Sequence, residues 1–415
     1  MLALLPLVAM FQAPPAVSPG DPYRLDTLVE RLGSDDIEAR NHAEAELRRY
    51  GERAEKSLRQ AIVASDAEIR IRARRLLDRI DWNRSSPVLL TRPGVVSNQI
   101  WMVETQSLKA RLVLDAGSTV YNPWWSPDGR RFAYRRVLNW LVVRDLETGE
   151  EERITPLGLA KDDDVFWSPD GTRILVISED ILRDDGTRED TPYARLYVVD
   201  VATKRTTLLT PEDRDHTYAC WSPDGKKIAY VNASLEGKDS FNTFDLFVID
   251  AAGGTPRRIT WDLAPKFSIQ WSPDGTKLAF DWEDPVRVEP SNPSTGSCGT
   301  CRIGVLDLRT GTARKITSGN DSASQPRWSP DGAELLFVGE GLFVIRADGS
   351  GLRVLHAAKD GCMSPRWSPD GRRILFQEHH GQTYRVCVIN SDGTGYRPLL
   401  DDSEGTSGAS WAPLR

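Results

Sequence analysis

The 415-residue sequence has no apolar run that approaches the roughly 18 residues needed by a membrane-spanning helix. It also lacks an excess of basic residues, because 60 aspartates and glutamates outnumber 53 lysines and arginines and leave a formal net charge of -7. Nucleic-acid-binding domains usually carry a basic stripe, so a nucleic-acid partner is not expected. The 40% hydrophobic content is sufficient for a core, and a globular protein without a transmembrane segment is predicted.

Histidine and cysteine are both scarce, with five of each. Cys298 and Cys301 form a C-x-x-C pair, but a zinc site would need a second pair or histidines at ligand spacing, and none is visible. A local disulfide between these two cysteines is predicted for an exported protein, whereas both would be free thiols in a reducing compartment. Cys220 and Cys387 are expected to pack in strands as small apolar residues. No metal site is predicted from the cysteines.

The sequence has no G-x-S-x-G motif, which is the turn that presents the nucleophilic serine in α/β-hydrolases. A serine hydrolase is therefore not indicated, and no peptidase domain is expected after the repeats that dominate this chain.

One pentapeptide, Trp-Ser-Pro-Asp-Gly, is present six times, and such recurrence is typical of a repeat protein. The tryptophans of the six copies and of a degenerate seventh copy are Trp125, Trp167, Trp221, Trp271, Trp328, Trp367 and Trp411. The aspartates of the six copies are Asp128, Asp170, Asp224, Asp274, Asp331 and Asp370. Successive tryptophans are 42, 54, 50, 57, 39 and 44 residues apart, about the length of one four-stranded propeller blade.

Each residue of the pentapeptide suits a tight strand reversal. Proline presets φ, the aspartate side chain accepts hydrogen bonds from nearby backbone N–H groups, and glycine adopts a positive φ without steric cost. The preceding tryptophan ends a strand, where its large ring can wedge between neighbouring sheets. The repeats therefore predict a structural role for these tryptophans and aspartates and not a catalytic one.

Regular strand patterns follow the pentapeptides. A run of alternating apolar and polar residues, such as 226–232, predicts a half-buried strand. An eleven-residue block comes next, for example 145–155 and 307–317, and its turn predicts a tight hairpin. This arrangement resembles the TolB-like, WD40-like (PD40) β-propellers over residues 86–415. The resemblance implies a disc of radially arranged four-stranded blades.

Seven blades are predicted for this mainly β domain. The block 104–114 has the same length as the other hairpins and brings their number to seven. Only four residues follow Trp411, so the C-terminal strand is expected to complete the blade that residues 86–115 begin. A six-bladed, TolB-like ring is the alternative.

The first 20 residues contain a short apolar core followed by small residues and prolines. This pattern indicates a secretory signal peptide with cleavage near Ala13 or Ala16, although the segment has no basic residue at its start. A disordered terminus is the alternative. A signal peptide would place the protein in the periplasm or outside the cell.

Residues 22–82 show helical periodicity and predict a small α-helical domain. Residues 36–47 match residues 66–77 at an offset of 30, a pattern that resembles HEAT-type helical repeats. Ser34 and Ser65 are the expected N-caps. The last helix carries five arginines, which predict either a solvated surface or a basic binding face: Arg70, Arg72, Arg74, Arg75 and Arg79.

Strand direction sorts the predicted loops onto two faces of the propeller. The turns between the first and second strands and between the third and fourth strands are short and share one face, the tight-turn face. The opposite face, the long-loop face, carries insertions at 179–194, 232–244 and 282–300 in consecutive blades. Long loops on a rigid scaffold often carry function, so a binding site is predicted on this face.

Six charged or aromatic residues approach the long-loop face in the same blades and form the predicted binding site: Asp162, Asp163, Asp164, His216, Tyr218 and Lys266. Alternation along the innermost strands is expected to point several of them toward the propeller axis. The acidic loop is a candidate for a divalent cation, although a solvated loop is the simpler interpretation. His216 has no metal-ligand motif around it, so a hydrogen-bonded histidine is expected.

The TolB-like resemblance implies a non-enzymatic, exported module that binds a protein partner of the cell envelope through this face. A monomer without a cofactor is expected. The alternative is a propeller-type lyase or hydrolase that acts on a glycan, for which Asp164, His216 and Lys266 are the only candidate constellation. The fold by itself does not name the function.

Overall fold

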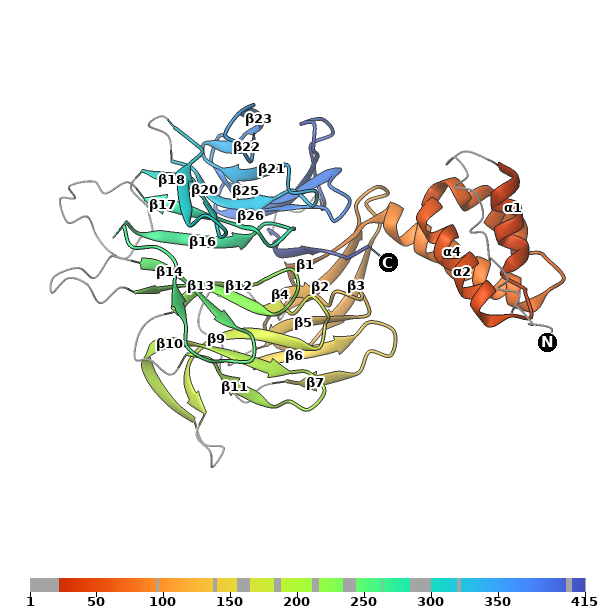
Figure 1. Ribbon diagram of the computed structural model, residues 1–415, viewed down its shortest axis with the longest axis horizontal. Helices are drawn as coiled ribbons and strands as arrows, with labels where there is room; N and C mark the ends of the chain where they lie inside the picture. The colour runs from red at the N-terminus through yellow and green to blue at the C-terminus, as the bar shows by residue number, and fades with distance from the viewer. Residues whose placement is uncertain are drawn as a thin grey trace, which may run out of the picture. The chain divides into compact units, whose positions relative to one another are not determined.

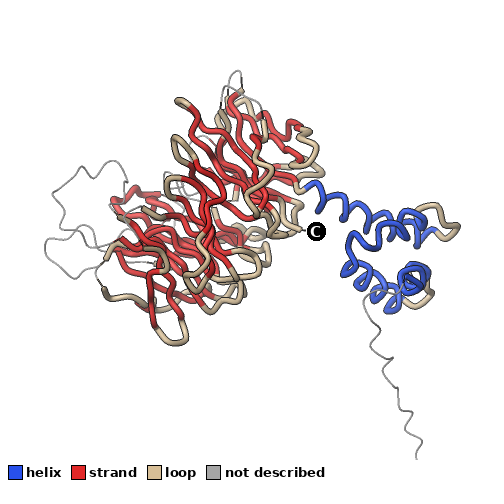
Figure 2. Tube along the Cα trace, turned by 90° about the horizontal axis from the view of Figure 1, so that it is seen from above, coloured by secondary structure: helices blue, strands red, loops and turns tan. Residues whose placement is uncertain are grey.

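The computed structural model describes residues 22–94, 97–136, 140–154, 165–182, 188–210, 216–233, 244–262, 264–283, 300–318, 322–400 and 405–414. The chain divides between Arg84 and Ser85 into an N-terminal helical unit and a β-propeller (Figure 1). Figure 2 shows that the described helices belong to the first unit and the described strands to the second. None of these helices has the length and apolar character needed to span a membrane.

The helical unit is built from four α-helices and one 3-10 turn within the described residues. These are α1 (Pro22–Arg31), α2 (Ile37–Tyr50), η1 (Gly51–Ala54), α3 (Glu55–Ala61) and α4 (Ala67–Ser85). Leu32, Leu47, Leu58 and Leu77 are among its buried core residues, as the helical periodicity predicts.

The 30-residue sequence repeat is matched by repeated contacts. The Arg40 guanidinium donates to the Ser34 carbonyl at 2.5 Å, and the Arg70 guanidinium, 30 residues later, donates to the Ala64 carbonyl at 2.7 Å. Each arginine thus holds the turn that precedes its own helix, because it satisfies a backbone carbonyl of that turn.

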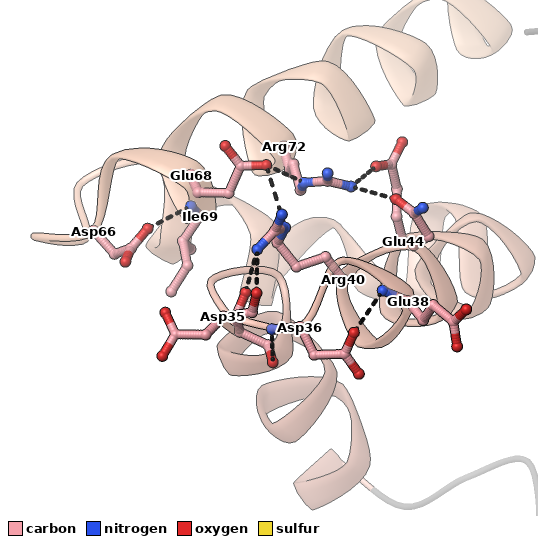
Figure 3. Close-up of polar contacts among 11 residues, drawn as sticks. Asp35, Asp36, Glu38, Arg40, Glu44, Asp66, Glu68, Ile69 and Arg72 are labelled. Atoms are coloured by element: carbon pink, nitrogen blue, oxygen red, sulfur yellow. Dashed lines mark hydrogen bonds and ion pairs between the residues drawn. The ribbon is translucent and has the colours of Figure 1, made fainter.

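The predicted N-caps at Ser34 and Ser65 are wrong, and aspartates take their place. Asp36 caps α2, and its carboxylate accepts the backbone N–H of Glu38 at 3.0 Å. At the start of α4 the Asp66 carboxylate accepts a backbone N–H three residues later, also at 3.0 Å. Both contacts are drawn in Figure 3. A carboxylate is favoured here because it also complements the positive end of the helix dipole.

Seven four-stranded antiparallel sheets form the propeller, which confirms the prediction of seven blades over six. Blade 1 consists of β4 (Val120–Trp125), β5 (Arg131–Arg136), β6 (Trp140–Asp145) and β7 (Glu151–Arg153). Blade 2 consists of β8 (Phe166–Trp167), β9 (Arg173–Leu182), β10 (Arg188–Asp200) and β11 (Thr206–Leu208). Blade 3 consists of β12 (His216–Trp221), β13 (Lys227–Ala233), β14 (Phe244–Asp250) and β15 (Arg257–Arg258). Blade 4 consists of β16 (Lys266–Trp271), β17 (Lys277–Glu283), β18 (Cys301–Asp307) and β19 (Thr312–Lys315). Blade 5 consists of β20 (Ser324–Trp328), β21 (Glu334–Val338), β22 (Gly341–Arg346) and β23 (Arg353–Ala357). Blade 6 consists of β24 (Cys362–Trp367), β25 (Arg373–His380), β26 (Thr383–Asn390) and β27 (Arg397–Pro398). Blade 7 consists of β28 (Ser407–Trp411), β1 (Pro87–Pro93), β2 (Asn98–Glu104) and β3 (Ala110–Asp115).

Blade 7 combines the two ends of the propeller sequence, as predicted. Its innermost strand, β28, pairs antiparallel with β1, and Val88 lies opposite Trp411. The Ser410 hydroxyl also donates to the Pro123 carbonyl of blade 1 at 2.7 Å. The C-terminal strand therefore closes both the sheet of blade 7 and the ring.

The first predicted long loop is partly strand. β9 continues to Leu182 and β10 already begins at Arg188, with a register shift between Asp190 and Arg195. The insertion thus lengthens a hairpin, because its residues continue the antiparallel pairing of the two strands. Most of the other two insertions lies outside the described residues.

All six complete pentapeptides fold into the same hydrogen-bonded corner. In blade 4 the Ser272 hydroxyl donates to Asp274 at 2.6 Å and accepts the Lys277 backbone N–H at 2.9 Å. The hydroxyl and the Thr276 backbone N–H hold the pKa of Asp274 down at about 2. In the other corners the distance from the serine Oγ to the aspartate Oδ1 is also 2.5 or 2.6 Å. These serine hydroxyls are therefore structural.

The motif tryptophans join neighbouring blades. Trp221 is only 8% exposed, and its indole donates to the Phe166 carbonyl of blade 2 at 2.9 Å. The Arg173 guanidinium of blade 2 lies 4.8 Å from the centre of the same ring. Three other indoles donate in the same way to the preceding innermost strand, namely those of Trp167, Trp367 and Trp411.

We expect Trp221→Ala to lower the free energy of unfolding by about 3 to 5 kcal/mol, because it leaves a cavity between two blades and removes an indole hydrogen bond. Urea unfolding followed by circular dichroism measures the change. Trp261→Ala is the matched control, because this ring is 64% exposed and its removal should cost under about 0.5 kcal/mol. Equal effects of the two substitutions would contradict the wedge role.

Deleting residues 408–415 should abolish cooperative thermal unfolding, because the loss of β28 uncovers the edge of β1 and opens the ring. Differential scanning calorimetry tests this expectation. Deleting only residues 414 and 415 leaves β28 intact and should preserve a single transition. A cooperative transition in the longer deletion would show that the ring does not depend on its C-terminal strand.

Candidate functional site

The innermost strands share an irregularity three residues before the motif tryptophan. The first strands of neighbouring blades contact one another around the propeller axis (Figure 1). In six blades this strand has a register shift and a residue in the left-handed region, with φ between 44° and 57°. We call these residues the bulge ring: Asn122, Tyr218, Ser268, Gln325, Ser364 and Gly408. In blade 2 the corresponding residue is Asp164, which lies outside the described residues.

The bulge ring is held together by contacts between consecutive blades. The Gln325 backbone N–H donates to Asp281 of blade 4 at 2.8 Å, and the Ser364 backbone N–H donates to the Gln325 side chain at 2.7 Å. Between blades 7 and 1, a Cβ added to Gly408 would lie 2.3 Å from the Asn122 side chain, so glycine is required there. Left-handed non-glycine residues are strained, and such strain gathers at binding and catalytic sites.

Asp281 of β17 is a titratable group that bonds the bulge ring at Gln325. Its side chain is buried, and burial raises its pKa to about 7, although hydrogen bonds from Ser268 and Gln325 and the charge of Arg327 oppose the shift. The carboxyl group therefore changes its charge near neutral pH, at a position that anchors one bulge to the next.

An aromatic cluster lies beside the ring on the long-loop face of blades 3 and 4. Tyr218 is 45% exposed, and its ring meets Phe267 edge-on with the centroids 6.0 Å apart. Phe244, at the start of β14, lies 5.7 Å from the same phenylalanine. Exposed and half-buried aromatic rings that touch one another are typical of protein-binding surfaces. We refer to Tyr218, Phe244 and Phe267 as the aromatic cluster.

His216 begins β12 but does not reach the surface. Its side chain is fully buried, and its ring stacks on Tyr230 with the centroids 5.3 Å apart. Asn232 lies opposite His216 in the sheet, and Asp245 lies opposite Asn232. His216 is thus one end of a buried polar row that crosses blade 3.

Lys266 belongs to the same buried region. Its ammonium group donates to the Ala264 carbonyl at 2.8 Å, forms an ion pair with Asp262, and lies 3.9 Å from Asp245. Asp245 also accepts hydrogen bonds from Arg258 at 2.7 Å and from Thr260 at 2.8 Å. The lysine is therefore a neutralised structural charge, because an unpaired ammonium could not be buried at this depth.

The sequence analysis expected His216 and Lys266 to line the channel mouth, whereas the structure buries both side chains fully. The bulges in β12 and β16 break the alternation, so residues counted back from Trp221 and Trp271 change their facing. Of the predicted residues described here, Tyr218 alone is exposed, while Asp162 to Asp164 lie outside the described residues. The binding roles themselves remain predictions.

Three of the cysteines that the structure describes are buried, and Cys362 is half-buried. Cys220 and Cys387 are buried, and burial raises the pKa of their thiols to about 12 and about 11. Cys301 is buried in β18 and is disulfide-bonded. Cys298 lies outside the described residues, so its pairing with Cys301 remains a prediction.

Among the described residues, no group of three or more histidines, cysteines, aspartates or glutamates is placed to hold a metal ion. The acidic loop 162–164 is not among them, so the cation candidate is untested. Phe244 and Phe267 were missed in the sequence because neither belongs to a motif. The available signal was their position, since each flanks a strand end on the face that carries the long insertions.

Comparison with known proteins adds the family. The family model PD40, TolB beta propeller domain, matches residues 91–280 and 233–415. The peptidase YuxL of Bacillus subtilis strain 168 is 25% identical over 42% of this chain and 29% of its own length. The Tol-Pal system protein TolB of Xanthomonas oryzae is 36% identical over 22% of this chain and 18% of its own length. The chain thus spans under a third of either relative.

Solved structures support the fold alone. An oligogalacturonate lyase in complex with manganese aligns with a TM-score of 0.56 at 17% identity, over 77% of this chain and 88% of that chain. The oligogalacturonate lyase of Vibrio parahaemolyticus aligns with a TM-score of 0.55 at 15% identity, over 74% and 87%.

We expect the stability of the protein to fall as pH rises from about 5 to about 8. Because the pKa of Asp281 is raised to about 7 in the folded protein, its protonated form stabilises the fold. This contribution is complete when the pH is below the pKa of Asp281 in the unfolded chain, and it is lost as pH rises through 7. Urea unfolding at several pH values measures it. Asp281→Asn should flatten this limb, whereas Asp78→Asn, an exposed control on α4, should leave it unchanged. An unchanged limb in Asp281→Asn would assign the pH dependence to other groups.

Proposed function

Because the chain belongs to the TolB β-propeller family, we propose that it is a non-enzymatic, protein-binding module of the cell envelope. The partner would bind on the long-loop face, at the bulge ring and the aromatic cluster. One observation carries the proposal: Tyr218 is held in a strained left-handed conformation and nevertheless exposes 45% of its surface. A strained, exposed aromatic residue is a poor choice for stability and a good one for recognition.

The surroundings of Tyr218 support a protein partner. Phe244 and Phe267 extend the apolar surface over two blades, while the bulge ring offers polar side chains such as Ser268 and Gln325 beside it. Interfaces typically combine such aromatic anchors with a polar rim. The net charge of -7 makes nucleic acid an unsuitable partner, and the proposal requires no cofactor.

An envelope location is part of the proposal. It is supported by the family and by the relative named as a Tol-Pal system protein, and the N-terminal 20 residues read as a secretory signal.

The alternative, a glycan lyase or hydrolase, depends on Asp164, His216 and Lys266. The described geometry weighs against it, because His216 and Lys266 are fully buried and Lys266 is already paired with Asp262. Asp164 lies outside the described residues. The likeness to oligogalacturonate lyases concerns the fold, and a fold hosts many functions.

A photo-crosslinking amino acid placed at position 218 tests the proposal in the native host. We expect a discrete protein adduct from this position and none from position 312. Thr312 is exposed at the start of β19, beside a turn of the tight-turn face. Combining Tyr218→Ala with Phe267→Ala should weaken binding of the captured partner by about 2 kcal/mol, as loss of an interface hot spot does.

Adducts from position 312 but not from 218 would move the binding surface away from the long-loop face. Release of unsaturated oligosaccharides from polygalacturonate by the purified protein would replace the binding proposal with the lyase alternative.

A further inference from the structure

The arginines of α4 have different surroundings, which the sequence alone did not separate. Arg70 donates to the carbonyls of Ala64 and Ser65, both at 2.7 Å, and so holds the start of its own helix. Arg72 lies between two carboxylates, with Glu68 and Glu44 each 2.6 Å away, as Figure 3 shows. These two arginines are structural and are neutralised or bonded within the helical unit.

Arg75 and Arg79 lie farther along the same side of α4 as Arg72, because they follow it by three and seven residues. No ion pair or hydrogen bond engages either side chain in the described part of the chain. Arg75 is exposed and Arg79 is half-buried. Burial lowers the pKa of Arg79, the positive charge of Arg48 lowers it further, and the negative charge of Glu44 opposes the shift.

Arg48 belongs to α2 and cannot be the counter-charge of this region, since it is itself positive. It contacts Glu44 Oε1 at 2.5 Å, while the other oxygen of Glu44 is engaged by Arg72. The buried Glu44 carboxylate is therefore bonded by two arginines, and it attracts Arg79 less than Arg48 repels it. We call Arg48, Arg75 and Arg79 the basic stripe.

The charge of Arg79 is disfavoured in the folded state, because burial and the repulsion from Arg48 outweigh the attraction of Glu44. A purely structural surface would not need this charge, since a neutral polar side chain would avoid the repulsion. Ile71 is 56% exposed and precedes Arg75 by four residues, so an apolar side chain adjoins the stripe on the surface of α4.

We propose that the basic stripe binds an extended acidic peptide segment of a protein partner. Arg75 and Arg79 would each grip a carboxylate through the planar guanidinium fork, and an apolar side chain of the segment would cover Ile71. This site is separate from the one proposed on the propeller and does not rest on it.

Geometry favours a peptide over a single phosphate group. Residues four apart on a helix are separated by about 6 Å along its axis, and alternate residues of an extended strand by about 7 Å. Glutamates at every second position of a strand therefore match the spacing of Arg75 and Arg79. A phosphate is better served by donors that converge on one point.

Fluorescence anisotropy with the full-length protein tests the proposal. The probe is a fluorescein-labelled heptapeptide of glutamates alternating with leucines, and the matched probe has lysines in place of glutamates. We expect Arg75→Gln with Arg79→Gln to weaken binding of the acidic probe about tenfold, because two charge-assisted contacts are lost. The control pair, Arg49→Gln with Arg53→Gln, removes the same charge from exposed positions and should change binding less than about twofold.

Thermal melting distinguishes binding from structure. Arg79→Gln should leave the melting temperature unchanged or raise it, because it relieves repulsion from Arg48. Arg75→Lys with Arg79→Lys keeps the charge and should retain part of the affinity. Tyr218→Ala should bind the acidic probe as the unmodified protein does, which keeps this site distinct from the propeller site.

Three results would overturn the proposal. The first is an acidic-probe affinity that is unchanged in the Arg75 and Arg79 variants or reduced equally in the control pair. The second is a lower melting temperature for Arg79→Gln, which would make the arginine structural. The third is displacement of the probe by inorganic phosphate at low millimolar concentration, which would identify a simple anion site.

Discussion

The propeller depends on the way each indole seals the boundary between two blades. A four-stranded blade has two apolar faces and cannot hide either one alone, so it is stable only between neighbours. The indole of Trp221 fills this boundary and donates to a carbonyl of the preceding innermost strand, and Arg173 covers its ring. The hydrogen-bonded Ser222–Asp224 corner follows this tryptophan directly in the chain. Because this repeated tryptophan contact stabilises the boundary between blades, the innermost strands can contain bulges and exposed aromatic residues.

The propeller could be predicted from the sequence because its structural motif is repeated along the chain. Six copies of one corner and a degenerate seventh predict seven blades, and the four residues left after Trp411 predict that β28 pairs with β1. Each copy supports the others, so a degenerate one such as residues 411–413 is still recognised. The helices of residues 22–82 could be predicted because apolar periodicity is a property of each short segment by itself.

The candidate site was less predictable, since it depends on departures from regular structure. No residue type marks the bulge ring: asparagine, tyrosine, serine, glutamine and glycine all occupy it. The bulges in β12 and β16 interrupt the strand alternation on which the prediction for His216 and Lys266 was based, and both side chains are buried. The pKa of Asp281 is likewise a property of burial by the neighbouring blades, which no linear pattern contains.

Closure by the last strand has a consequence for the order of folding in the cell. Blades 1 to 6 are each continuous in sequence and can form as the chain emerges, but blade 7 requires β28. Strand β1 begins at residue 87, whereas its inner partner β28 begins at residue 407. Strand β1 therefore remains without this partner until some 300 later residues have been synthesised or translocated. A chain that crosses a membrane from its N-terminus would thus arrive as an open arc, and the ring could close only after β28 has crossed as well.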